Sequence, residues 1–465
     1  MKQTFLVNKR GFLQLEQKIA MVMMIVGLIM LFLIPTWQTP DEYTHLKLIG
    51  SSIKNEEFAE ILAEDVGIEG SRIMTHYEEK VDAKELKEAL ISAPKYEKSE
   101  VLPKGVSVSI VKHLPATLGI ILGIIAGLPT YWVLQLGEIF ALLFYVFMGY
   151  FALKMMPLKK EVFTIILLMP MALQQAGGIG YDSVLIPLCF FWVAYVLHLR
   201  FKEKIQLKDF LCLIALWILI TYIKMPYCFL ILLILILPLE KIHFEIGKSI
   251  INRDWIIKYR WLMIIMGLFF ATVGVYLLKD NFWVQLVIGL IKEWRQTVYL
   301  LMQTMKTWGL SLITSSVGNF GWLDTPISVW VALLVYVVIS LFAVVNSDEK
   351  DGNNLRKRER IILCGTWVIL CLFTAFAMVN HTIMVILYGS ELVEKTYDIQ
   401  TALYQIPYIG GLQGRYFLPY IILLFLAIPQ KKQVRKGKVW FAVAIFEIVM
   451  LIYIIYVLLC RYWIA

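Results

Sequence analysis

The chain has 465 residues, of which 59% are hydrophobic and only 17% are charged, and its formal net charge is +9. Soluble domains are about half apolar and about a quarter charged, so this composition excludes an ordinary soluble protein and predicts a polytopic membrane protein. The apolar runs are continuous rather than alternating, which favours helices over a β-barrel. The six cysteines all lie in apolar runs and indicate neither a disulfide framework nor a zinc site. The basic residues cluster between apolar runs, which the positive-inside rule explains without a nucleic-acid partner.

The apolar runs predict about eleven membrane spans, since roughly twenty apolar residues cross a bilayer. The expected spans are residues 19–37, 131–153, 161–178, 183–199, 209–223, 225–239, 261–279, 326–345, 361–380, 414–429 and 439–460. With the N-terminus inside and the C-terminus outside, the basic clusters fall on the cytoplasmic side. Residues 113–127 are short and rich in glycine, so we expect a re-entrant or interfacial helix there. The run 209–239 is expected to break at Lys224-Met225-Pro226, because proline disfavours a helical residue before it.

These patterns predict an all-α protein with a single membrane domain over residues 1–465. Residues 38–130 are expected to form an extracytoplasmic loop with interfacial helices, inserted after the first span. Within this loop Phe58, Ile61 and Leu62 share one helical face. A second helix is expected between a capping box at Asp82 and a stop at Pro94. Residues 280–325 and 381–413 are expected to complete the exterior surface.

An acidic pair, Asp41 and Glu42, follows the first span, and His45 comes one helical turn later. A carboxylate at a membrane boundary can act as a base, with a raised pKa, or bind a metal ion through oxygen. The alternative is a solvated turn in which Asp41 caps the next helix. The residue types therefore allow catalysis, a divalent-cation site or a structural turn.

Two further exterior positions carry polar groups. Tyr181 and Asp182 follow a glycine-rich turn and open a span, so Asp182 can cap that helix, place a second carboxylate at the water interface, or do both. Lys224 lies alone between two apolar runs. It is either a snorkelling lysine or a phosphate partner, because an isolated cation near the membrane is costly.

Two later segments also reach the exterior side. Asp324 stands before Pro326 in a glycine- and tryptophan-rich stretch, where it fits either a helix start or a polar site residue. Gln413, Arg415 and Tyr416 open the tenth span. Arg415 would lie at the N-terminus of this helix, where the helix dipole is unfavourable for a cation. We therefore expect Arg415 to face a carboxylate or a phosphate.

Two glutamates are predicted inside spans, Glu138 in residues 131–153 and Glu447 in residues 439–460. Acidic residues at membrane depth are functional candidates, although a neutral carboxyl hydrogen-bonded to a neighbouring helix is an alternative.

The exterior segments contain five motifs in order: PDEYTH (40–45), GYDS (180–183), KMPY (224–227), GNFGWLDTP (318–326) and QGRYFLP (413–419). This ordered set resembles an uncharacterised family of predicted bacterial multi-pass membrane proteins, over about residues 19 to 430. That family is related to the GT-C superfamily of lipid-phosphosugar-dependent glycosyltransferases.

This resemblance implies a GT-C-like bundle in the bacterial cytoplasmic membrane, with its active face outside. It implies that Asp41 acts at the reaction centre with Glu42 beside it, and that some members use Mg²⁺ or Mn²⁺. The implied donor is a polyprenyl-phosphate sugar and the implied acceptor an envelope glycan or lipid-linked sugar. His113 stands where similar proteins often have a His-Pro-Pro segment, but here the second proline is absent. Glu138 stands where they often have an arginine.

Two other classes of function remain open. In a transporter or flippase for a lipid-linked sugar, Glu138, Glu447 and Lys224 would line a pathway and Asp41 would be dispensable. In a non-catalytic scaffold for glycan assembly, no single polar substitution would abolish function.

Overall fold

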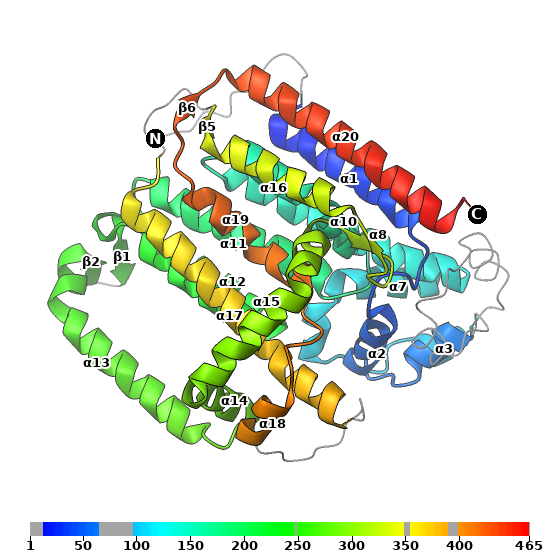
Figure 1. Cartoon of the computed structure of the whole chain (residues 1–465), viewed down its shortest axis with the longest axis horizontal. Coiled ribbons are helices and arrows are strands. Elements are labelled where there is room, and N and C mark those ends of the chain that lie inside the picture. Colours follow the sequence, from blue (N-terminus) through cyan, green and yellow to red (C-terminus); the bar gives the residue numbers. More distant parts are fainter. Residues whose placement is uncertain (1–12, 65–95, 247–248, 348–353, 389–398, 465) are drawn as a thin grey trace.

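The computed structural model describes residues 13–64, 96–246, 249–347, 354–388 and 399–464, and it is mostly helical (Figure 1). The strands form three small two-stranded sheets. Two are antiparallel, β1 (His243–Ile246) with β2 (Ser249–Asn252) and β3 (Asn319–Phe320) with β4 (Thr325–Pro326), and the parallel one joins β5 (Val345–Asn346) to β6 (Lys432–Gln433).

Within the described residues, six helices are long and apolar enough to cross a bilayer, which fits the helical membrane protein expected from the composition. They are α1 (Leu15–Leu33), α8 (Thr130–Met155), α11 (Asp182–Phe201), α13 (Arg253–Leu277), α17 (Lys357–Tyr388) and α20 (Lys436–Tyr462). Other expected spans correspond to shorter helices. These are α12 (Leu207–Ile223), the 3₁₀ helix η2 (Met225–Ile236), α16 (Val329–Val344), the 3₁₀ turn η4 (Gly414–Phe417) and α19 (Leu418–Ala427).

The break expected at Lys224 is present. The helix α12 ends at Ile223, Lys224 is extended, and η2 begins with Met225-Pro226. A 3₁₀ helix rises about 2.0 Å per residue, so the twelve residues of η2 reach about 24 Å, further than an α-helix of the same length. A short segment can therefore extend across most of a bilayer core.

Two regions differ from the sequence-based expectation. The span expected at 161–178 is two helices, α9 (Lys160–Leu167) and α10 (Pro170–Ala176), because Pro170 lacks the backbone donor that would continue α9. The segment 280–325, expected only as exterior chain, contains α14 (Phe282–Lys292) and the 24-residue α15 (Trp294–Val317).

The segment after α1 forms a small helical layer. Its elements are α2 (Glu42–Ser52), α3 (Phe58–Glu64), α6 (Lys98–Val101) and the 3₁₀ helix η1 (Val108–Lys112). Phe58 and Leu62 are fully buried on one face of α3, as expected. The second expected helix of this loop, from Asp82 to Pro94, lies outside the described residues.

The short helix α7 (Leu114–Ala126) packs against the start of α8. A Cβ atom at Gly119 would lie 2.3 Å from the Leu136 carbonyl oxygen, so only glycine permits this close approach. Thirteen residues of α-helix extend about 20 Å, less than the roughly 30 Å hydrocarbon core. The length therefore agrees with the expected re-entrant or interfacial helix.

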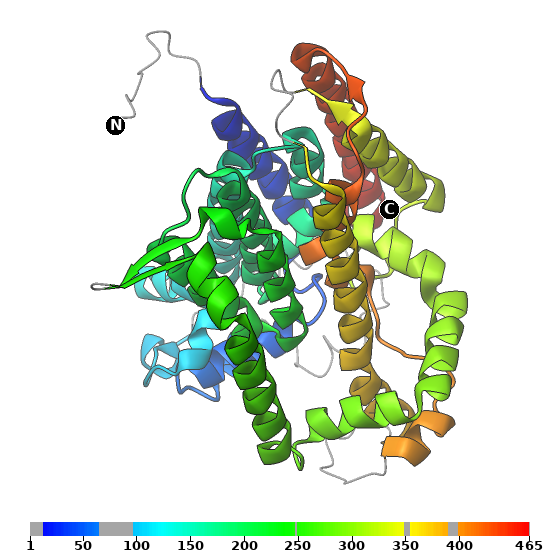
Figure 2. The same ribbon diagram turned by 90° about the vertical axis from the view of Figure 1, so that its left-hand side faces the viewer.

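The packed core surrounds α11 and α19, with α1 and α20 side by side along one edge (Figure 1). Helix α13 stands apart from this core, beyond the hairpin β1–β2 and η3 (Leu239–Lys241), and α14 continues from its far end (Figure 2). A second apolar cluster joins α14, α15 and α17 to α18 (Ile399–Gln405). Helix α15 thereby supports the segment that enters η4.

Candidate functional site

The centre of the site is an ion pair between Asp41 and Arg415. The Arg415 Nη2 group donates to Asp41 Oδ2 at 2.8 Å, and Nη1 donates to Gln175 Oε1 at 3.1 Å. The Arg415 side chain is 5% exposed, whereas that of Asp41 is 49% exposed. A buried cation is thus held against a carboxylate that solvent or a ligand can still reach.

The local backbone explains how both partners are presented. Asp41 precedes α2 with a φ of +69°, a left-handed conformation that aspartate tolerates better than most residues. Its side chain makes no capping bond to α2, so the capping role considered from sequence is not realised. Gly414 packs η4 against α15, where a Cβ would lie 2.2 Å from the Ser316 backbone nitrogen. This contact fixes the neighbouring Arg415.

Glu42 is directed into the protein and not toward Arg415. Its carboxylate oxygens accept from the backbone N–H groups of Thr39 and Ile179, each at 3.3 Å. Burial raises the pKa of Glu42 to about 7, against the opposing effect of backbone N–H donors including Ile179 and Thr39. Glu42 therefore joins the start of α2 to the turn before α11, and its expected catalytic role stays a prediction.

Two histidines distant in sequence meet beside this pair. His45 Nδ1 and His113 Nε2 are 3.0 Å apart, and the Tyr181 ring packs edge-on against His45 at 4.8 Å. Burial lowers the pKa of His45 to about 4, although Asp182 and Asp41 act in the opposite direction. Burial, and then the charge of His45, lower the pKa of His113 to about 3. Both imidazoles are consequently neutral near pH 7.

Lys224 lies in a ring of phenols. Its Nζ is 4.1 Å from the ring centroid of Tyr416, 5.2 Å from that of Tyr181 and 6.0 Å from that of Tyr227. Cation–π attraction of this kind stabilises a poorly hydrated ammonium group. Lys224 forms no ion pair with a carboxylate of the described residues. Burial lowers its pKa, and the charge of Asp182 partly restores it.

Asp182 lies in the first turn of α11, whose N-cap residue is Tyr181, so of the two roles considered from the sequence Asp182 does not take the capping one. Its charge acts on Lys224, His45 and Arg415, which places it electrostatically within the same cluster. Gln413 directly precedes η4, and its Oε1 is buried without a hydrogen-bond partner among the described residues.

Three acidic candidates have other surroundings. Asp324 belongs to the β3–β4 hairpin, not to a helix start, and pairs with Arg461 of α20 at 2.5 Å. Glu138 accepts from Gln135 Nε2 at 2.8 Å inside the bundle. Glu447 lines a small apolar cavity between α1, α10 and α20. The hairpin of Asp324 still reaches the site region, because Trp322 Nε1 donates to the Trp37 carbonyl oxygen at 2.8 Å.

Gln175, the second partner of Arg415, was not predicted from the sequence. The available signal was the adjacent pair Gln174-Gln175, two amides in an otherwise apolar run just before the glycine-rich turn. Several buried polar atoms in this region have no partner among the described residues, namely Arg415 Nε, Gln175 Nε2, both polar atoms of the Gln174 amide, Gln413 Oε1 and His113 Nδ1. Buried polar atoms are normally satisfied, so such a set is typical of a site that admits water or a polar ligand.

The acidic pair is not arranged as a complete metal site. Asp41 faces Arg415, whereas Glu42 accepts from backbone amides. Within the described residues, no group of three or more His, Cys, Asp or Glu side chains could hold a metal ion.

The cluster lies at one side of the bundle, because α1 and α12 end there and α7, α11 and η4–α19 begin there. Fold and site together define a class: a helical membrane protein that gathers charged, imidazole and phenol side chains at one end of its helices. The family model of the predicted membrane proteins named DUF2142 matches residues 24–424, and the chain belongs to that family. No curated protein and no solved structure matches the chain.

Proposed function

We propose that this protein is a GT-C-type membrane glycosyltransferase that moves a sugar from a polyprenyl-phosphate donor to an extracytoplasmic envelope glycan. The proposal includes a bundle of about eleven spans in the bacterial cytoplasmic membrane, with the N-terminus inside. In this arrangement the Asp41–Arg415 cluster faces outward.

One observation carries the proposal: four segments that are distant in sequence bring both signs of charge to one end of the helices. Asp41 supplies a reachable carboxylate, and Arg415 and Lys224 supply two cations. Transfer from a sugar phosphate needs a base for the acceptor hydroxyl and cations for the departing phosphate. The cluster contains both kinds of group beside one another.

The proposed reaction is a direct displacement. The acceptor hydroxyl gives its proton to Asp41, and its oxygen forms a bond to the anomeric carbon of the donor sugar. The bond from that carbon to the phosphate oxygen breaks, and the electron pair leaves with the polyprenyl phosphate. Arg415 orients Asp41 through their ion pair, and Lys224 neutralises charge that grows on the phosphate.

The other cluster residues are assigned to substrate binding. Tyr181 and Tyr416 present rings next to Lys224, where an apolar sugar face or an isoprenoid unit can pack. His45 and His113, neutral near pH 7, can donate to or accept from sugar hydroxyl groups. Asp324 is assigned to the rim through its hairpin, which contacts Trp37.

The proposal includes a divalent cation, Mg²⁺ or Mn²⁺, and Asp41 is the member of the acidic pair that would bind it. Mg²⁺ commonly takes one or two protein carboxylates and completes its shell with substrate phosphate and water. Glu42 is unsuited to that role, because backbone N–H groups occupy its oxygens. Activity that survives EDTA would remove the cation from the proposal.

The transport alternative receives less support from the geometry. Lys224 lies in the phenol ring, Glu138 bonds to Gln135, and Glu447 faces an apolar cavity of about 60 Å³. None of the described cavities is lined by all three of these residues.

The donor side of the proposal is tested with Lys224→Gln and, as matched control, the exposed Lys104→Gln on the same predicted face. The assay measures sugar transfer by the purified full chain from a polyprenyl-phosphate-sugar extract to envelope glycan. We expect Lys224→Gln to raise the KM for donor by about tenfold, which corresponds to one charged contact, and Lys104→Gln to leave it unchanged. Absence of transfer by the wild-type protein would contradict the proposal.

A further inference from the structure

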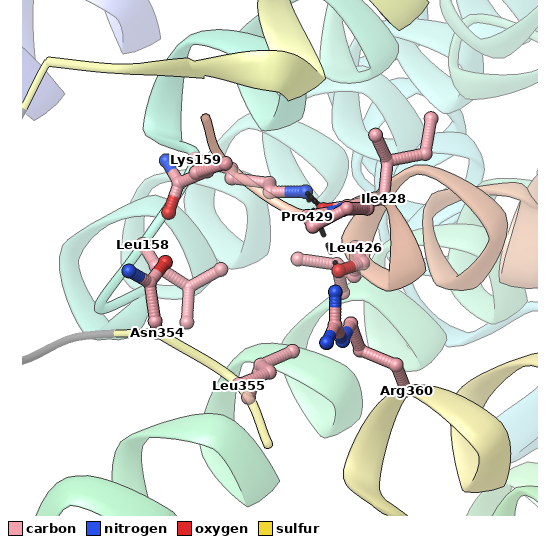
Figure 3. Close-up of a pocket in the computed structure, with 9 residues that line it drawn as sticks. Leu158, Lys159, Asn354, Leu355, Arg360, Leu426, Ile428 and Pro429 are labelled. Carbon is pink, nitrogen blue, oxygen red and sulfur yellow. Dashed lines mark hydrogen bonds between the residues drawn. The ribbon is translucent and has the colours of Figure 1, made fainter. Parts of the chain in front are cut away.

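A cavity of about 200 Å³ lies at the opposite end of η4–α19 from Arg415 (Figure 3). Its walls come from the loop after α8, the start of α17 and the chain that leaves α19, with Lys159, Arg360, Asn354 and Gln430 among the lining residues. Pockets that hold drug-sized ligands are roughly 300–1,000 Å³. This cavity therefore fits a small group, such as one phosphate, and not a whole lipid-linked sugar.

Lys159 and Arg360 are the basic side chains that line the cavity. Its lining includes no acidic residue from the part of the chain that the structure describes. Two described acids of the adjoining helices have other partners: Glu161 accepts from Ser347, and Glu359 forms an ion pair with Arg200 at 2.5 Å. The described lining of the cavity is therefore basic.

Lys159 is 4% exposed and has no donor left for a ligand. Its Nζ donates to the carbonyl oxygens of Phe425 at 2.7 Å, Leu426 at 3.3 Å and Ile428 at 2.5 Å, so it caps the end of α19. Burial, and then repulsion by Arg360, lower its pKa to about 7. An anion beside Arg360 would relieve that repulsion.

Arg360 is the group that can bind an anion directly. Its guanidinium extends into the cavity toward Leu426 (Figure 3), and it forms no ion pair with any described carboxylate. A guanidinium group can hold two oxygens of one phosphate at once.

We propose that this cavity is a binding site for a phosphate group, independent of the glycosyltransferase site and on the opposite face of the bundle. The chain that leaves α8, the chain that leaves α19 and the start of α17 meet there. In a helical membrane protein, such helix ends lie close to the lipid headgroups. Basic pockets between membrane helices bind anionic headgroups in this way. The phosphate is that of an anionic phospholipid or a free phosphate ion, which share this chemistry.

The test uses the full chain with Arg360→Gln, and with Lys357→Gln as a control that removes an exposed charge from the same helix turn. Native mass spectrometry measures retention of phosphatidylglycerol against phosphatidylcholine, and ³¹P NMR measures binding of inorganic phosphate. We expect Arg360→Gln to weaken binding of at least one of these phosphate probes by about tenfold, and Lys357→Gln to leave it unchanged.

A second variant, Asn354→Trp, places a large side chain in the lining of the cavity without removing charge. It should weaken binding of the same phosphate probe about as much as Arg360→Gln does. Preferential retention of phosphatidylglycerol assigns the site to a headgroup, and binding of inorganic phosphate alone assigns it to a free anion. Equal binding by wild type and Arg360→Gln would overturn the proposal. So would a wild-type protein that binds neither phosphate probe.

Discussion

Asp41 and Arg415 are separated by 374 residues, yet Arg415 Nη2 and Asp41 Oδ2 are 2.8 Å apart. The pair joins the segment after the first helix to the start of η4. Because Arg415 is buried and Asp41 is about half exposed, the ion pair both holds the fold together and presents a carboxylate at the surface. This dual position explains why the sequence allowed a structural and a catalytic interpretation of the same residues.

The coupling between these two side chains can be measured with a double-mutant cycle of Asp41→Asn and Arg415→Gln. A hydrogen bond to a charged group contributes about 1.5–3 kcal/mol, so we expect a coupling free energy of at least about 1 kcal/mol in unfolding of the purified full chain. If the changes in unfolding free energy of the two single variants sum to that of the double variant within about 0.5 kcal/mol, the contact does not contribute to stability.

The pH dependence of stability should reveal Glu42. Its pKa is raised from 4.5 to about 7 by burial, so between these values the folded state binds a proton that the unfolded state has lost. The contribution of Glu42 to stability should therefore fall as pH rises through this window, by about 3 kcal/mol in total. His45 and His113, whose pKa values are lowered from 6.5 to about 4 and about 3, act in the opposite direction below about pH 6.5, so their contribution overlaps that of Glu42.

The difference between wild type and Glu42→Gln isolates this contribution from that of the histidines. We expect the difference in unfolding free energy to change with pH between about 4.5 and 7 and to be constant above about pH 8. A difference that is flat over the whole range would mean that Glu42 titrates normally in the folded protein.

Close packing of α7 on α8 makes Gly119 sensitive to one added methyl group. The Cβ atom of Gly119→Ala would collide with the Leu136 carbonyl oxygen, and overpacking of this kind typically costs about 1–3 kcal/mol. Gly365 of α17 is the matched control, since a Cβ atom there has nothing within 4 Å. Gly365→Ala should be neutral or stabilising by up to about 1 kcal/mol in the same unfolding measurement. Equal effects at both positions would contradict the packing described here.

The orientation of the chain can be tested by labelling in intact cells. In a background without the six native cysteines, Val106→Cys should react with a membrane-impermeant maleimide, because Val106 is 71% exposed in the predicted exterior segment. Lys357→Cys, on the predicted cytoplasmic side, should react only after permeabilisation. The reverse pattern would invert the topology and place the Asp41 cluster inside the cell.

The sequence was sufficient for features that depend on local chemistry. Apolar length predicted the membrane class, and proline chemistry predicted the break at Lys224, which the structure contains. The same principle applied to Pro170 would have divided the span at 161–178. Helix α15 was missed because its exposed faces include Arg295 and Lys306, which lower its apolar character below that of a membrane span.

The site could be predicted as a list of residues but not as a set of contacts. Polar residues beside span ends indicated Asp41, His45, Asp182, Lys224 and Arg415, and the family resemblance added His113. The structure brings these residues together. The sequence predicted a carboxylate or a phosphate as the partner of Arg415. Which carboxylate it is, and the partners of Glu42, could not be predicted, because they depend on tertiary packing between α2, α10 and η4. Periodicity carries no information on which helix ends meet.

The most direct test of the central claim compares sugar transfer by wild type, Asp41→Asn and Glu138→Gln at equal expression, with a polyprenyl-phosphate-sugar pool as donor and envelope glycan as acceptor. Removal of a general base commonly costs about 10²-fold or more in rate, so we expect Asp41→Asn to lose transfer and Glu138→Gln to retain it. Wild-type activity in Asp41→Asn would contradict the account, and loss of activity in Glu138→Gln alone would favour a transport pathway through the bundle.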